Sequence, residues 1–511
     1  MDACKAASSE RFANRVLGIH RFVNRSLIAR LLQYMLPGDT AAPPSPLLVR
    51  QLGKNALVVD ADALLLKPAP GAAFPAYFLV AVEAGGYVRG LVLLALYPFL
   101  RVLLPHGALA KAMAFVSLCG LRRDEAARIG RAVLPKLFFR EAPGMQSNAI
   151  IEPLNALPEK VKVVAVSRTF PTVMVEAFLK EYVGFDAVAG RELKGGSSSR
   201  YLTGVTTELD MESLAARVVV LMKQTEKKTT KTASSCGYPK PMVFHDGRLA
   251  FTPTPAAVLA MYVYLPFAVV LAVVRIAIYV LLPWRVSSVV AGLTGVRVRV
   301  IGATPAAEDS DDDAGGTGKP RRGRLYACNH RTLLDPVGIA CALGRPVAAV
   351  TYSLSRLSEV LSPIPLRRLT RNRDEDRRRM SSMLARGDVV VCPEGTTCRE
   401  PYLLRFSPLF TELASEVTPV AVDARTTVFY ATSTSPVAKS FDSVYFLMNP
   451  RPEYSVQFLE PVNTENGKSS IELANEVQGA LAAALGFEGT ALTRKDKYLL
   501  LAGNEGVVKT K

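Results

Sequence analysis

Histidine and tryptophan are scarce in this chain, which has four histidines and one tryptophan among its 511 residues. The seven cysteines are an odd number, scattered without a pairing pattern or a metal-binding spacing. This distribution excludes a disulfide framework and predicts reduced thiols that face the cytosol. The sequence also lacks zinc spacings and interleaved aromatic and basic residues, so we expect no nucleic acid among its partners. No motif indicates a protein partner.

Acidic residues are outnumbered: 45 Asp and Glu stand against 62 Lys and Arg, which gives a formal charge of +17. Such an excess suits an anionic partner, such as an anionic bilayer surface or a phosphorylated substrate. The chain is also apolar for a purely soluble protein, with 49% hydrophobic residues and a mean hydropathy of +0.20. Its length allows two or three domains, each with a proper core.

A signal peptide is not expected, because no short apolar region with a small-residue cleavage site follows the first basic residues. Residues 11–36 instead alternate arginines with apolar residues. This pattern predicts a basic amphipathic segment over residues 1–48, which either lies on a membrane surface or packs on the next domain. An arginine-rich, acid-poor start also resembles a mitochondrial transit peptide, so a mitochondrial location is an alternative.

Long apolar runs are few, and two stand out. Residues 74–104 are interrupted by Glu83 and Arg89, so a membrane helix and a buried helical insert are both open. Residues 254–284 contain 19 successive residues without a charge, close to the ~20 that span a bilayer. Pro266 lies within this run, which predicts either one kinked span or a hairpin of two short helices. We expect the second run to be embedded in a membrane.

Short strand-like runs alternate with helical patterns in both halves of the chain, which argues for α/β architecture. The acidic, glycine-rich residues 303–323 predict a disordered loop. The linker and two mobile loops are predicted at residues 37–46, 195–199 and 223–235. The strand candidates are residues 56–59, 161–166, 325–328, 347–351, 389–392 and 418–422. The helix candidates are residues 375–385, 409–415 and 471–485.

One histidine stands in an informative place. The strand at residues 325–328 delivers Asn329 and His330 to its carboxyl end, where α/β sheets usually carry their chemistry. Asp335 follows, and Pro336 predicts the start of a helix, so Asp335 also fits an ordinary helix cap. The two interpretations are compatible, because a carboxylate on one ring nitrogen raises the basicity of the other. His330 can then remove the proton of an alcohol that attacks an acyl carbonyl.

A second segment, Cys-Pro-Glu-Gly-Thr at residues 392–396, ends a predicted buried strand. Its glycine lets the backbone approach a ligand closely. Thr396, the backbone amides and Arg399 can bind phosphate oxygens. The tripeptide Pro-Glu-Gly alone is equally compatible with a plain turn after a strand.

A third segment, residues 367–373, is rich in arginine. The planar guanidinium suits phosphate because it donates hydrogen bonds in pairs. Arg371 is the first candidate for a phosphate ligand, and Arg368 is the next. The arginines at 377–379 follow in a helical pattern with acidic residues, which predicts a solvated helix face or a contact with anionic headgroups.

The order of these segments resembles the glycerolipid acyltransferase superfamily: His-x4-Asp, an arginine segment, Pro-Glu-Gly-Thr, and a strand that ends near Pro419. The longer strings at residues 392–407 and 244–249 resemble the land-plant sn-2 glycerol-3-phosphate acyltransferases. This resemblance covers nearly the whole chain. It implies a haloacid-dehalogenase-like Rossmannoid domain at 49–250 with a hydrophobic insert at 74–104, a membrane segment at 254–284, an acyltransferase α/β domain at 285–490, and a tail at 491–511.

The resemblance implies that His330 and Asp335 are the catalytic dyad. It implies transfer of an acyl group from acyl-CoA to glycerol 3-phosphate, for glycerolipids or for precursors of the polyesters cutin and suberin. No cofactor or metal is expected. A location in the endoplasmic reticulum membrane, with a cytosolic active site, goes with this function. The residues that the family's motif blocks place at the substrates are Arg371, Glu394, Gly395, Thr396, Arg399 and, near the acyl chain, Pro419.

The N-terminal half carries a weaker site. Asp60 and Asp62 follow a hydrophobic strand, which resembles the nucleophile and the acid/base of haloacid-dehalogenase-type phosphatases, and Ser167 resembles their second motif. The expected Gly-Thr after the aspartates is missing, and residues 195–240 hold no Gly-Asp-x-x-x-Asp cluster for Mg²⁺, which needs several carboxylates. We therefore predict a degenerate phosphatase domain that binds no Mg²⁺ and leaves the product phosphorylated, as lysophosphatidic acid.

Other functions remain open at this point. A lysophosphatidic acid acyltransferase would share the dyad and differ only in its acceptor pocket. A chain with an active phosphatase domain would release monoacylglycerol, and a Mg²⁺-dependent phosphomonoesterase would depend on Asp60. A non-catalytic membrane scaffold would not need His330.

Overall fold

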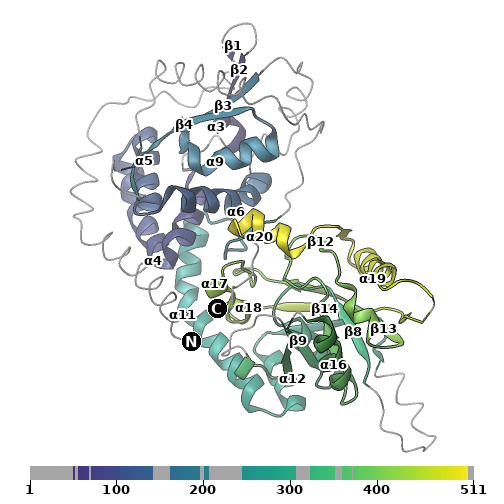
Figure 1. The fold of residues 1–511 in the computed structure, drawn as a ribbon. Coiled ribbons are helices and arrows are strands. Elements are labelled where there is room, and N and C mark those ends of the chain that lie inside the picture. Colours follow the sequence, from purple (N-terminus) through teal and green to yellow (C-terminus); the bar gives the residue numbers. More distant parts are fainter. Residues whose placement is uncertain are drawn as a thin grey trace, which may run out of the picture. The chain divides into compact units, whose positions relative to one another are not determined.

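The computed structural model describes residues 50–51, 56–67, 69, 71–141, 162–195, 201–206, 244–305, 323–351, 359–370, 372–465 and 467–504 (Figure 1). The chain divides into two compact units. The N-terminal unit comprises residues 1–247 and 252–262, and the C-terminal unit comprises residues 248–251 and 263–511. The segment predicted at 1–48, the loop at 223–235 and most of the acidic loop at 303–323 lie outside the described residues.

A four-stranded sheet forms the centre of the N-terminal unit, in the order β1-β2-β3-β4. β2, β3 and β4 are parallel, whereas β1 pairs antiparallel with β2. Most residues of β3 and β4 are buried, and many of them are valine or alanine. This is expected for parallel strands that are covered on both faces. The strands are β1 (Arg50–Gln51), β2 (Ala56–Asp60), β3 (Lys162–Pro171) and β4 (Ala187–Arg191), with a separate pair β5 (Leu193–Gly195) and β6 (Leu202–Thr206). Short helices follow β2 and β3 directly: α3 (Ala61–Leu65) and α9 (Thr172–Phe178).

Three further helices belong to this unit: α4 (Phe74–Leu103), α5 (His106–Leu118) and α6 (Arg123–Glu141). α4 is the helix that the first apolar run predicts. Gly86 interrupts it with a φ of 70°, a conformation that glycine adopts without a steric penalty, so the helix is kinked there. Arg89 is buried and donates to the carbonyl of Ser117 on α5 (3.1 Å). The protein itself thus accommodates one of the two charges that interrupt this run.

The second apolar run forms one continuous helix, α11 (Pro255–Leu281), rather than two short helices, and α12 (Trp284–Leu293) follows after Pro283. Within the part of the chain that the structure describes, α4 and α11 are long and apolar enough to cross a membrane. Val263, Phe267 and Val270 of α11 are exposed to the surroundings of the protein.

An eight-stranded sheet forms the centre of the C-terminal unit, in the order β10-β9-β11-β8-β13-β14-β7, with β15 at one end of β13. All pairs are parallel except β13 with β14 and β13 with β15. The strands are β7 (Arg297–Ile301), β8 (Leu325–Cys328), β9 (Ala348–Thr351), β10 (Leu366–Arg368), β11 (Val389–Val391), β13 (Glu416–Arg425), β14 (Glu453–Phe458) and β15 (Val462–Asn463). The fully buried β8 and β11 place their carboxyl ends side by side, which brings the loops after them together.

Two helices of this unit cover the sheet with apolar side chains. Met380 and Leu384 of α16 and Leu481 of α19 share one hydrophobic cluster with Val389 and Val417 of the sheet. The helices are α14 (Asp335–Leu343), α16 (Arg373–Leu384), α17 (Pro436–Lys439), α18 (Asp442–Leu447), α19 (Ser470–Leu485) and α20 (Arg494–Ala502). A small parallel pair, β12 (Tyr402–Leu403) and β16 (Glu488–Gly489), completes the unit. The predicted tail therefore contains a helix.

The strands predicted from sequence correspond to β2, β3, β8, β9, β11 and β13, and the helices at 375–385 and 471–485 correspond to α16 and α19. α16 begins earlier than predicted because the Asn372 side chain accepts from the N–H groups of Asp374 and Glu375. The helix predicted at 409–415 is wrong, since Pro408–Glu412 form a 3₁₀ turn. Short 3₁₀ turns are common connectors between elements, and β13 begins soon afterwards, at Glu416.

Candidate active site

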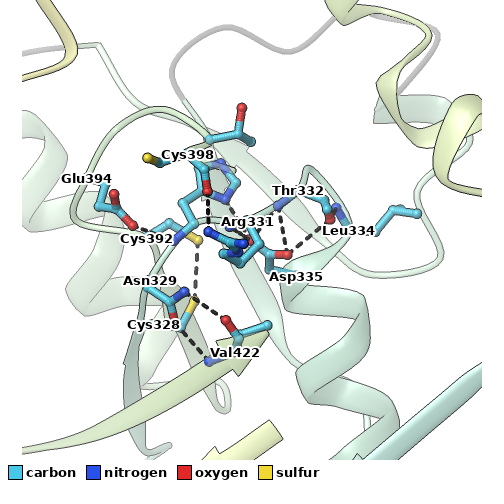
Figure 2. A network of polar contacts seen from close by, with 12 residues as sticks. Cys328, Asn329, Arg331, Thr332, Leu334, Asp335, Cys392, Glu394, Cys398 and Val422 are labelled. Atoms are coloured by element: carbon cyan, nitrogen blue, oxygen red, sulfur yellow. Dashed lines mark hydrogen bonds and ion pairs between the residues drawn. The ribbon is translucent and has the colours of Figure 1, made fainter. Parts of the chain in front are cut away.

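The loop after β8 carries the predicted dyad, and Asn329 fixes its beginning. The Asn329 side chain donates to the carbonyl of Val422 on β13 (2.8 Å) and accepts from the N–H of the same residue (2.8 Å). Figure 2 shows these two bonds beneath the loop. Because a buried amide that makes both bonds has one favoured orientation, the chain enters the following His330 along a defined path.

The His330 imidazole lies against the carboxylate of Asp335, with 2.9 Å between Nδ1 and Oδ2. Asp335 is fully buried and accepts from the N–H groups of Arg331 (2.6 Å) and Thr332 (2.9 Å), and from the Thr332 hydroxyl (3.0 Å) (Figure 2). The cap interpretation needs a correction here. Leu334 is the N-cap residue of α14, and Asp335, its first helical residue, turns back to cap the preceding loop.

The environment favours the protonated form of His330. Burial favours the neutral imidazole, but the sulfur of Cys392 and the carboxylate of Asp335 outweigh it and raise the pKa of His330 to about 10. Cys392 lies 3.4 Å from Cys328, sulfur to sulfur. With Nδ1 held by Asp335, Nε2 is the ring nitrogen that exchanges protons. Such a strongly basic imidazole can deprotonate a hydroxyl and later protonate a leaving group.

The loop after β11 carries the predicted Glu394, and it is bound to the loop of the dyad. One Glu394 oxygen accepts from the N–H of His330 (2.6 Å), and the other accepts from the N–H of Leu404 (2.9 Å). Burial raises the pKa of Glu394 to about 7, and these hydrogen bonds oppose the shift. Both carboxylate oxygens of Glu394 therefore accept hydrogen bonds from main-chain N–H groups. The structure thus places Glu394 as a support of the loop that carries His330, rather than at the surface of the site.

The next predicted residues lie on the turn after Glu394. Gly395 has a φ of 67° and donates its N–H to the carbonyl of Cys392 (3.1 Å), which closes a tight turn beside His330. Thr396 is buried, and its side chain interacts with the phenol of Tyr498 on α20. Gly395 lines the cavity described below, whereas Thr396 faces α20.

Of the three predicted arginines, the two that the structure describes, Arg368 and Arg399, have separate partners. Arg399 donates to the side chain and the carbonyl of Thr432, and its guanidinium lies 4.4 Å from the ring centre of Tyr430. Arg368 pairs with Glu359 on the surface. Arg371 lies outside the described residues. Pro419 is buried in β13 opposite Ala327.

Sequence reasoning missed two cations that hold the loop after Gly395. Arg331 donates to the carbonyls of Cys398 (3.0 Å), Arg399 (2.9 Å) and Glu400 (2.7 Å). Lys497 of α20 is 4% exposed and donates to the carbonyl of Thr397. The position of Arg331 directly after His330 could have marked it in the sequence as a residue of the site. Lys497 gave none, because its partner lies a hundred residues away.

A cavity of about 230 Å³ opens beside His330. Its walls are mostly apolar and come from α11, β7, α14 and α18, with Ile276, Val298, Val337, Phe441, Val444 and Leu447 among the lining residues. Its polar side chains include His330, Cys392, Lys439, Ser440 and Ser443. A mostly apolar cavity with an imidazole at its wall can hold an acyl chain while the carbonyl end reaches that imidazole.

The three residues of the predicted phosphatase site do come together. Asp62 accepts from the Ser167 hydroxyl (2.6 Å) and from the N–H groups of Arg168 and Thr169 (2.8 Å each). Burial raises the pKa of Asp62, and the hydrogen bond from Ser167 opposes the shift. Asp60 accepts from the N–H groups of Asp62 (2.9 Å) and Ala63 (3.4 Å) at the start of α3.

These contacts do not fit a Mg²⁺ site. The Asp62 carboxylate is engaged by protein donors, and Asp60 caps a helix. Among the described residues, no group of three or more His, Cys, Asp or Glu side chains lies close enough to hold a metal ion. Mg²⁺ needs several carboxylates to offset the cost of its dehydration.

Two protein families match this chain. Residues 56–245 match the HAD-like domain of RAM2-like glycerol-3-phosphate acyltransferases, and residues 298–428 match the acyltransferase family. Fold and site therefore define a two-domain protein, in which a haloacid-dehalogenase-like domain precedes an acyltransferase domain of mixed α/β structure. This confirms the fold class that the sequence predicts.

Full-length relatives narrow the class. The chain is 40% identical to the probable glycerol-3-phosphate acyltransferase 2 of Arabidopsis thaliana, over 90% of this chain and 92% of that protein. It is 41% identical to glycerol-3-phosphate acyltransferase 1 of A. thaliana (85% and 78% covered) and 38% identical to glycerol-3-phosphate acyltransferase RAM2 of Petunia hybrida (86% and 95% covered). The chain belongs to the plant glycerol-3-phosphate acyltransferase family.

Proposed function

We propose that this protein transfers an acyl group from acyl-CoA to glycerol 3-phosphate. The observation that carries the proposal is the buried pair of His330 and Asp335 at the wall of an apolar cavity. Relatives that are 38–41% identical to this chain are named glycerol-3-phosphate acyltransferases. A base, an acyl-sized cavity and the family thus support the same reaction.

In the proposed reaction, Asp335 holds Nδ1 of His330, and Nε2 removes the proton from the acceptor hydroxyl. The hydroxyl oxygen attacks the thioester carbonyl, and the carbon–sulfur bond of the tetrahedral intermediate then breaks. The CoA thiolate takes the proton from the imidazolium, so His330 returns to its neutral form. The products are lysophosphatidic acid and free CoA. Side chains perform each proton transfer, so the proposed reaction uses no cofactor.

The product keeps its phosphate in this proposal. A haloacid-dehalogenase-type phosphatase needs a free nucleophilic aspartate, an aspartate that moves a proton, and Mg²⁺. Here the Ser167 hydroxyl and two main-chain N–H groups engage Asp62. We therefore propose that the N-terminal domain has no phosphatase activity and binds no Mg²⁺.

The proposal includes a membrane location. Two helices are long and apolar enough to cross a membrane, and the formal charge of +17 suits anionic lipid surfaces. Reduced cysteines agree with an active site on the cytosolic side of the endoplasmic reticulum. The preference for the sn-2 hydroxyl, and a role in glycerolipid or cutin and suberin precursor synthesis, rest on the strings at residues 392–407 and 244–249.

Membranes that contain the protein test this function when they receive labelled glycerol 3-phosphate and a series of acyl-CoA donors. We expect labelled 2-acyl lysophosphatidic acid, with a loss of about 10²- to 10⁴-fold in His330→Ala. Asp60→Asn should leave the rate unchanged. Absence of His330-dependent incorporation with every donor would refute the proposal. If lysophosphatidic acid is the only acceptor that is acylated, the protein is a lysophosphatidic acid acyltransferase instead. If monoacylglycerol is the main product, the proposal that the phosphatase domain is inactive is refuted.

A further inference from the structure

The cavity wall beside His330 carries a lysine that no sequence motif indicated. Lys439 ends α17 and lines the cavity together with Ser440, Gly395 and His330. Within the described residues, no carboxylate lies close enough to form an ion pair with Lys439. Burial raises the pKa of the Tyr498 phenol, but Lys439, Lys497 and further neighbours outweigh burial, so that the Tyr498 pKa is lowered.

Two of the predicted phosphate ligands, Arg368 and Arg399, are engaged elsewhere, and the third arginine, Arg371, lies outside the described residues. Arg399 is bound to Thr432 and stacked on Tyr430, and neither Arg399 nor Arg368 is among the residues that line the cavity. An acceptor whose hydroxyl reaches His330 must place its phosphate within a few ångströms of that histidine. Among the described residues that line the cavity, Lys439 is the one permanent cation.

Arg248 holds the turn that carries Lys439. Its guanidinium donates to the carboxylate of Asp442 (2.6 Å) and to the carbonyl of Ala438, and it lies 4.3 Å from the ring centre of Tyr445. These partners lie on both sides of Lys439 along the chain. Arg248 belongs to the string at residues 244–249, and no step of the proposed reaction involves these residues. A buried guanidinium with several fixed acceptors gives this turn a rigid base.

Asp442 is the carboxylate that could compete for the Lys439 ammonium. It is fully buried, and burial raises its pKa to about 6, while Arg248 and Lys439 oppose the shift. Its Oδ1 pairs with Arg248, and its Oδ2, which has no hydrogen-bond partner among the described residues, is not within ion-pair distance of Lys439. The ammonium therefore keeps its positive charge available to an anion in the cavity.

We propose that Lys439 binds the phosphate of the acceptor and that Ser440 lies at the same subsite. This inference rests on the proposed function, because it assigns the acceptor's charge to one wall of that cavity. A lysine ammonium is a compact charge that binds phosphate well, and its attraction strengthens where apolar walls exclude water. The subsite selects acceptors that carry a phosphate near the reacting hydroxyl.

Steady-state kinetics with two acceptors test the assignment. Lys439→Ala should raise the KM for glycerol 3-phosphate about tenfold or more, which corresponds to ~1.4 kcal/mol, and leave the KM for acyl-CoA within about twofold. Lys439→Arg should recover part of the loss because it keeps the charge. The slow acylation of plain glycerol should not change. Lys468→Ala is the matched control, since Lys468 is exposed and pairs with Glu476.

Several outcomes would overturn the proposal. An unchanged KM for glycerol 3-phosphate would do so, and a rise confined to the KM for acyl-CoA would assign Lys439 to the phosphates of CoA instead. Equal losses with glycerol and glycerol 3-phosphate would show a role in folding or chemistry rather than in phosphate binding.

A binding measurement separates this inference from the proposed function. For the purified full chain in detergent, inorganic phosphate should raise the unfolding temperature of the wild type and of Lys439→Arg, but not of Lys439→Ala. Stabilisation without acyl transfer would refute the proposed function and keep the subsite. Acyl transfer with equal phosphate stabilisation of the wild type and Lys439→Ala would refute the subsite and keep the function.

Discussion

The main-chain N–H of His330 donates to the side-chain carboxylate of Glu394 over 2.6 Å. The second Glu394 oxygen accepts from the N–H of Leu404, so one side chain joins the loop after β8 to the chain beyond the Pro-Glu-Gly turn. Sequence reasoning assigned Glu394 to substrate binding, but its carboxylate instead holds the main chain at His330, the proposed base. The pair explains why the two loops act as one site.

Glu394→Gln should weaken both the site and the fold. A glutamine offers one acceptor oxygen and one amide donor, so one of the two N–H groups would face another donor without a partner. We expect a loss of about 1–3 kcal/mol in the free energy of unfolding and a lower kcat, with little change in either KM. Denaturant unfolding and kinetics of Glu394→Gln measure these effects, and Glu416→Gln on the exposed start of β13 is the control. A selective rise in the KM for glycerol 3-phosphate at unchanged stability would show instead that Glu394 binds the substrate.

The pH profile should depend on Cys392. The base works as neutral imidazole, so kcat/KM rises with pH as His330 loses its proton, and the raised pKa places this limb above the ordinary value of 6.5. Cys392 is one cause of the raised pKa, and a serine hydroxyl stays neutral. In Cys392→Ser the limb should therefore move to lower pH.

Cys341→Ala provides the comparison for that shift, because Cys341 lines the same cavity but is not among the groups that raise the pKa of His330. Its profile should coincide with that of the wild type. A limb that stays in place in Cys392→Ser, or moves to higher pH, would contradict the electrostatic role of Cys392.

The two aspartates of the N-terminal domain should differ in their effect on stability. Asp62→Ala leaves the Ser167 hydroxyl and two N–H groups without their acceptor, at a cost of about 1–3 kcal/mol for each buried group. Asp60→Ala removes a helix cap, at a cost of about 1 kcal/mol. Thermal unfolding of both variants shows whether Asp62→Ala loses more stability than Asp60→Ala, as expected. Equal effects on stability, together with loss of a phosphatase activity in both, would show an active site instead.

The exposed face of α11 should hold the protein at the membrane. Phe267 and Val270 are exposed there, so a lysine at either position would place a charge where the protein meets lipid. We expect Phe267→Lys with Val270→Lys to shift the protein toward the fraction that alkaline carbonate extracts. Ile471→Lys replaces an apolar residue of similar exposure on α19 and should not shift it. An unchanged distribution of the double variant would argue against α11 as an anchor.

Local patterns were enough for much of the fold. Apolar runs marked β8, β11 and the middle of β13, because the parts of a strand that are buried on both faces are apolar. The 3₁₀ turn at Pro408–Glu412 was mistaken for an α-helix, because so short a segment has too few residues for its pattern to distinguish the two. The spacing of His330 and Asp335 was sufficient because both lie on one short loop.

The sequence by itself determined the class of this protein, six strands of its two sheets and the pairing of His330 with Asp335, because each of these depends on residues close together in the chain. Only the tertiary structure showed what the side chains of Glu394, Arg399 and Lys439 face. Hydrogen bonds reach a few ångströms in space but join residues 64 apart, as in His330 and Glu394. Whether a charged side chain faces the substrate or the protein is therefore settled by packing, which no local pattern records.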